Sequence, residues 1–77
     1  MQLKIISTTE VIYEGTAEAV TLPGANGSFT VLQNHASLIS TLVPGKIVYR
    51  GPQGEGSYEV KGGIVDVDSN VVSVCTY

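Results

Sequence analysis

Residues 22–45 read LPGANGSFTVLQNHASLISTLVPG, and this stretch decides the fold. Two Pro-Gly pairs, Pro23-Gly24 and Pro44-Gly45, flank an apolar strand at Phe29–Leu32 and a run of small residues at Asn34–Ser37, which we call the elbow. Each pair fits the centre of a type II turn, because Pro presets a negative φ and Gly supplies a positive one. No set of catalytic side chains accompanies them, so the stretch predicts a shaped surface.

The same alternation of strand and turn continues on both sides of this stretch. Short β-branched runs with a period of two are separated by Gly, Pro, Asn or Ser. Strands are expected near Gln2–Ile6, Val11–Glu14, Glu18–Leu22, Ser28–Leu32, Leu38–Leu42, Lys46–Arg50, Ser57–Lys61, Ile64–Val67 and Val71–Thr76. They leave no room for helices. The sequence therefore predicts one all-β domain over residues 1–77, a small flattened barrel or β-sandwich of about nine to ten short strands.

Alternation within the strands also assigns an inner and an outer face. The side chains expected to share the inner face are Val20, Leu22, Ile47, Tyr49, Val65 and Val67. The last strand, Val71–Thr76, is largely apolar on both faces, which predicts cover on both sides, either inside the fold or by a partner.

Three further segments read as turns or bends. Gly51–Gly56 is expected to be a loose, polar hairpin tip, and Ser69-Asn70 to join the last two strands tightly. Gly62-Gly63 lies between two strand-like runs, where glycine usually marks a bulge, a sharp bend or a close backbone approach.

Composition limits the classes of partner. A chain of 77 residues buries only about 60% of its unfolded surface. Charged residues make up 14% of the sequence, against roughly 25% in typical domains, so apolar side chains must remain near the surface, where they usually meet a partner. The net charge is −3 and Lys and Arg form no cluster, which argues against binding nucleic acid.

Cysteine content and hydropathy bear on the compartment. Cys75 is the single cysteine, so no internal disulfide is expected and a reducing compartment is the simpler interpretation. No apolar run approaches the roughly 20 residues of a membrane-spanning helix. We therefore expect no direct membrane insertion.

The side chains that could act in catalysis or bind a metal do not form a recognisable site. His35 is the sole histidine and has no carboxylate or thiol near it in sequence, which favours a turn or interface histidine over a general base. Asp66 and Asp68 share a strand face about 7 Å apart, but no further ligand accompanies them, which favours a solvated acidic face over a metal site. We expect no catalytic residue, no metal and no cofactor, and hence a protein that is not an enzyme.

Many positions in order resemble one family. They are Glu14-Gly15, Leu22-Pro23-Gly24, Gly27, Phe29-Thr30-Val31-Leu32, His35-Ala36, Leu38, Pro44-Gly45, Gly62-Gly63, Val65-Asp66-Val67 and Asn70-Val71. Together they resemble the amino-terminal β-sandwich domain of the F-type ATP synthase epsilon subunit, which is called delta in mitochondria. The resemblance covers nearly the whole chain.

The resemblance implies a non-catalytic rotor subunit of the central stalk, which couples proton-driven rotation to ATP synthesis. Its partners would be the gamma subunit and the c-ring, at the cytoplasmic face of the bacterial inner membrane. The matching c-ring interface is Gly27, Ser28, Phe29, Thr30 and Val31, and the matching gamma interface is His35, Ala36, Ser37 and Leu38. Without the resemblance, the residues also fit a freestanding β-sandwich that binds another protein.

The chain departs from the family pattern at three points. Family members usually continue into a carboxy-terminal pair of helices that can bind ATP or inhibit hydrolysis. This chain ends at Tyr77, so we expect coupling and assembly roles and no inhibitory helices here. Position 37, often proline in the family, is Ser37, so the elbow lacks a φ lock and gains an amide donor. Position 28, acidic in some members, is Ser28, which removes the basis for an ion pair with the c-ring.

Overall fold

Nine strands and no helix make up the computed structural model, which describes all residues 1–77. The strands are β1 (Gln2–Ile6), β2 (Val11–Thr16), β3 (Ala19–Gly24), β4 (Gly27–Leu32), β5 (Leu38–Leu42), β6 (Gly45–Gly51), β7 (Gly54–Val60), β8 (Gly63–Asp68) and β9 (Val71–Thr76). Each of them overlaps an expected strand, so the all-β prediction is confirmed. The structure contains no helix that is long and apolar enough to span a membrane.

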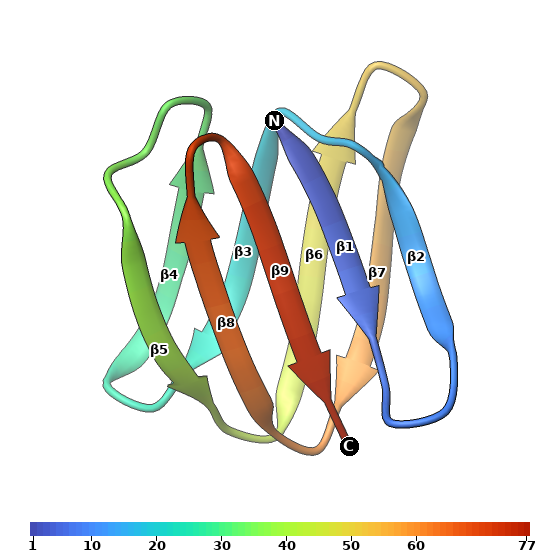
Figure 1. The fold of residues 1–77 in the computed structure, drawn as a ribbon, viewed down its shortest axis with the longest axis vertical. Coiled ribbons are helices and arrows are strands. Elements are labelled where there is room, and N and C mark those ends of the chain that lie inside the picture. The colour runs from blue at the N-terminus through green and yellow to red at the C-terminus, as the bar shows by residue number, and fades with distance from the viewer.

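One continuous sheet folds back on itself to make two layers (Figure 1). The order β2-β1-β9-β8-β5 forms one layer, and β4-β3-β6-β7 forms the other. The layers join where Gly24 of β3 pairs with Leu42 of β5. Beside this pair, the Val43 N–H donates to the Pro23 carbonyl oxygen over 2.9 Å. The expected sandwich or flattened barrel is thus a single curled sheet.

The core lies between the layers and follows the predicted alternation. Its buried members are Met1, Leu3, Ile5, Ala17, Val20, Leu22, Val31, Leu42, Ile47, Val60, Val65, Val67, Val72 and Val74. Strands β2 and β7 are the two ends of the strand order. The Tyr13 ring of β2 packs on the Tyr49 ring of β6 with centroids 4.4 Å apart. Tyr49 is half-buried, and the other residues predicted for the inner face are buried completely or nearly so.

The chain itself covers strand β9 on one face only. Val72, Val74 and Thr76 are buried, but Val71 and Cys75 on the opposite face are exposed. Cover of both faces inside the fold is therefore wrong, and cover of the outer face by a partner stays a prediction.

Both Pro-Gly turn predictions are wrong. Pro23 and Gly24 belong to β3, and the turn falls on Ala25-Asn26, closed by the Gly24–Gly27 pair. The positive φ, 121°, is at Gly27 and not at Gly24. Gly45 likewise has no positive φ and begins β6. The physical reason is pairing: extending β3 gives the Pro23 carbonyl a partner, which outweighs the local preference for a turn.

The other two predicted turns are tight. The predicted tip at Gly51–Gly56 shortens to a two-residue turn at Pro52-Gln53, because β6 and β7 remain paired as far as Gly51 and Gly54. Ser69 and Asn70 both have positive φ, 50° and 64°, as a two-residue type I′ hairpin turn requires. The tight connection predicted for these two residues is confirmed.

Of the three features that glycine usually marks between strands, a close backbone approach is present at Gly62-Gly63. Gly63 has a φ of 146°, and a Cβ added there would overlap the Cys75 carbonyl oxygen of the neighbouring strand. Gly27 also has a positive φ, 121°, but a Cβ there would meet no atom within 4 Å. The two glycines therefore share the conformational constraint and differ in packing.

We expect Gly63→Ala to lower the free energy of unfolding by about 3 kcal/mol or more, since backbone strain and a clash act together. Gly27→Ala, the matched control, should lose only the strain contribution of about 1–3 kcal/mol. Urea unfolding followed by circular dichroism measures both. Equal losses in the two variants would show that the approach to Cys75 does not constrain position 63.

Candidate docking surface

The elbow, Asn34–Ser37, connects β4 to β5 and lies beside the turn between β8 and β9 (Figure 1). Its four side chains are exposed. Asn34 has a φ of 63°, and the His35 N–H donates to the Leu32 carbonyl oxygen over 3.2 Å, which forms the turn out of β4. The elbow therefore projects from the sandwich without contributing to its core.

The His35 ring is held against the elbow backbone. Its Nδ1 lies 2.6 Å from the Ala36 carbonyl oxygen. Because a carbonyl oxygen only accepts, Nδ1 must carry the proton in this hydrogen bond. The bond thus orients the ring without involving Nε2.

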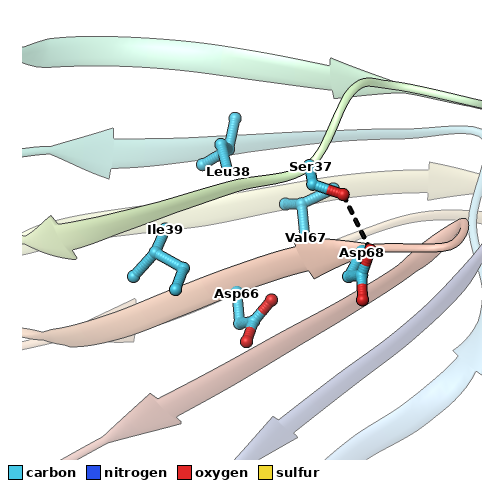
Figure 2. Close-up of a pocket in the computed structure, with 6 residues that line it drawn as sticks. All are labelled: Ser37, Leu38, Ile39, Asp66, Val67 and Asp68. Atoms are coloured by element: carbon cyan, nitrogen blue, oxygen red, sulfur yellow. Dashed lines mark hydrogen bonds between the residues drawn. The ribbon is translucent and has the colours of Figure 1, made fainter.

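Two side chains of the β8–β9 hairpin hold the elbow. The Asn34 N–H donates to Oδ1 of Asn70 over 2.8 Å. The Ser37 hydroxyl donates to Oδ1 of Asp68 over 2.7 Å, as Figure 2 shows. These contacts join residues more than thirty positions apart in the sequence, and no local pattern signals them. Sequence reasoning missed both contacts.

The residues predicted for a c-ring interface fall on β4, and they differ in exposure. Gly27, Ser28 and Thr30 are exposed, and Phe29 is half-buried with its ring packed against the core. Val31 is fully buried. Its side chain supports this strand from inside and is not open to a partner. Leu38, predicted for the gamma interface, is half-buried and also packs on the core.

A shallow groove lies next to the elbow, between β5 and β8. Its volume is about 480 Å³, and its lining is Ser37, Leu38, Ile39, Asp66, Val67 and Asp68 (Figure 2). Ile39 is 74% exposed on this surface. No group of three or more His, Cys, Asp or Glu side chains that could hold a metal forms here or elsewhere in the structure.

A largely apolar row crosses the outer face of the same layer. Strand register places five residues side by side, in the order Thr41, Ile64, Cys75, Ile6 and Val11. Ile64 and Val11 are 51% and 55% exposed. Pairing between strands that are distant in sequence brings these residues together, so no local sequence pattern predicts the row. It leaves apolar surface of the kind that often meets another protein.

Fold and surfaces together define a small, helix-free β-sandwich domain with an exposed elbow and a largely apolar row across one outer face. Residues 1–77 match the family of the ATP synthase delta/epsilon chain β-sandwich domain over their whole length. The chain therefore belongs to this family.

Individual relatives agree with this membership. The chain is 33% identical over 76 residues to the ATP synthase epsilon chain of Leptospira borgpetersenii, covering 99% of this chain and 60% of that protein. It is 39% identical over 75 residues to the ATP synthase epsilon chain of Bordetella petrii, covering 96% of this chain and 53% of the relative. The chain thus spans little more than half the length of these relatives.

Solved structures share the fold. A chain in the mitochondrial ATP synthase of Euglena gracilis, in a structure of OSCP, F1 and c-ring, aligns with a TM-score of 0.88 and 26% identity. That alignment covers 96% of this chain and 48% of the other. A chain in the central stalk and c-ring structure of Tetrahymena thermophila mitochondrial ATP synthase aligns with a TM-score of 0.82 at 15% identity, over 97% of this chain and 61% of the other.

The exposure pattern along β4 gives a direct test. We expect Val31→Ala to lower the free energy of unfolding by about 1–3 kcal/mol, because it removes buried methyl groups. Ser28→Ala, an exposed control on the same strand, should change it by less than about 0.5 kcal/mol. Urea denaturation of both variants checks this, and a neutral Val31→Ala would mean that the side chain does not lie in the core.

Proposed function

We propose that this chain acts as a non-catalytic central-stalk subunit of an F-type ATP synthase, binding the gamma subunit and resting on the c-ring. The observation that carries the proposal is family membership across residues 1–77. It is supported by the fold shared with chains from structures described as F1 with c-ring and as central stalk with c-ring. In this role the protein couples proton-driven rotation to ATP synthesis.

We assign the gamma contact to the elbow and to Leu38, where β5 begins. Three of the predicted residues, His35, Ala36 and Ser37, are exposed, and Leu38 is half-buried at their base. Two hydrogen bonds to the β8–β9 hairpin support this assignment, because an interface loop that is already ordered loses less entropy on binding.

We assign the c-ring contact to β4. Gly27, Ser28 and Thr30 are exposed along it, Phe29 is partly accessible, and the buried Val31 supports the strand from inside. Because β4 pairs only with β3, its other edge is free. The uncharged β4 surface favours packing and backbone contacts over ion pairs with the c-ring.

A role in transmitting rotation suits the architecture. The layers enclose one continuous core, and close-packed interiors deform little under load. A thin sandwich of this kind can carry force between a partner at the elbow and another along β4. The protein would then lie at the cytoplasmic face of the bacterial inner membrane, held there by its partners.

His35→Glu tests the gamma contact, because it places a charge on the exposed elbow without disturbing the core. We expect the dissociation constant for the matching gamma subunit to rise at least about tenfold. Isothermal titration calorimetry gives the constant, and size-exclusion chromatography with mass detection shows whether wild type forms a one-to-one complex.

Thr8→Glu is the matched control. It adds the same charge at an exposed residue between β1 and β2, at the opposite end of the strands from the elbow (Figure 1). Gamma affinity should stay within about twofold of wild type. A folded wild-type chain that does not bind gamma would refute the central-stalk role and favour a freestanding protein-binding sandwich, whereas equal weakening by both variants would refute the elbow assignment.

A further inference from the structure

We propose that Asp68 and Asn70, on the β8–β9 hairpin, are positioning residues that hold the elbow in its docking conformation. The inference rests on the proposed gamma contact and adds residues outside the predicted interface. Asp68 accepts from Ser37 over 2.7 Å and Asn70 from the Asn34 backbone over 2.8 Å. The hairpin thus holds the elbow at both of its ends.

The elbow needs an external support because it has little of its own. All four of its side chains are exposed, so none is fixed by core packing. Its only hydrogen bond to another backbone group outside the strand ladders is the turn bond from the His35 N–H to the Leu32 carbonyl oxygen. A segment with so few contacts is expected to sample other conformations unless other groups restrain it.

The hairpin is a suitable support because it is itself firmly held. Val67 and Val72, which precede and follow the Asp68–Val71 pair, are buried in the core. The Asn70 carbonyl oxygen accepts from the Gln2 N–H over 3.0 Å, which ties the turn to β1 as well. The backbone of Asn70 is therefore fixed on one side while its side chain reaches the elbow on the other.

The two bonds constrain different parts of the elbow. Asn70 binds the backbone at its first residue, Asn34, which has a φ of 63°. Asp68 binds the side chain of its last residue, Ser37, through a carboxyl oxygen that accepts from the hydroxyl. His35 and Ala36 lie between these two points, so the same two bonds restrict where they can lie.

A double-mutant cycle on Ser37 and Asp68 tests the first bond. We expect Ser37→Ala and Asp68→Ala each to weaken gamma binding about three- to tenfold, and the double variant to be no weaker than either single one. Asp68→Asn is the matched control: it removes the same charge as Asp68→Ala but keeps an oxygen that accepts from Ser37. It should bind within about twofold of wild type if position matters and charge does not.

Hydrogen exchange in the free chain provides a readout that does not depend on gamma. Asn70→Gly keeps a residue that tolerates positive φ but removes the acceptor, so the Asn34 amide should exchange at least about fivefold faster. Asn70→Asp retains an acceptor and should preserve protection. Amides in β9 serve as the reference, because global destabilisation would accelerate them too.

The outcomes separate the two proposals. If wild type does not bind gamma, the proposed function fails and the docking role of these residues fails with it, while exchange still reports whether Asn70 restrains the elbow. If wild type binds, additive losses in the cycle, or Asp68→Asn as weak as Asp68→Ala, would overturn the positioning role of Asp68. Unchanged Asn34 exchange in Asn70→Gly would overturn that of Asn70.

Discussion

The structure depends on the fold-back between β3 and β5, where one sheet becomes two layers. A single ladder pair, Gly24 with Leu42, makes the junction, and the hydrogen bond from Val43 to Pro23 reinforces it. A sheet of this size can enclose a core only if it turns in this way. The buried rows of Val20 and Leu22 on one layer and Val65 and Val67 on the other then face each other.

The surfaces follow from that geometry. Folding at the β3–β5 junction places β4 at one edge and brings β5 against β8. The elbow, which must bridge β4 and β5, therefore lies next to the β8–β9 turn. Contacts from Asn70 and Asp68 become possible only through this adjacency. The same pairing assembles the largely apolar row on the outer face, from residues that lie far apart in the chain.

Local sequence patterns predicted well the features that depend on one strand at a time. The buried faces at Val20, Leu22, Val65 and Val67 follow from a period of two. The tight turn at Ser69-Asn70 and the close approach at Gly62-Gly63 follow from what those residues tolerate. The two Pro-Gly predictions were wrong for the opposite reason. At Pro23-Gly24 the local preference for a turn competes with hairpin pairing to β4 and with pairing to the distant β5, and pairing prevails.

The sequence by itself determined the all-β class, the number of strands, the inward-facing residues and the family, because each rests on local periodicity or on matched positions along the chain. Tertiary structure alone decided that Val31 supports β4 from inside while Ser28 and Thr30 remain exposed at its surface. It also decided that Asp68 and Asn70 form hydrogen bonds to the elbow. The physical reason is that hydrogen bonds and burial depend on which strands become neighbours, and neighbours in a folded sheet are set by the fold-back and not by order along the chain.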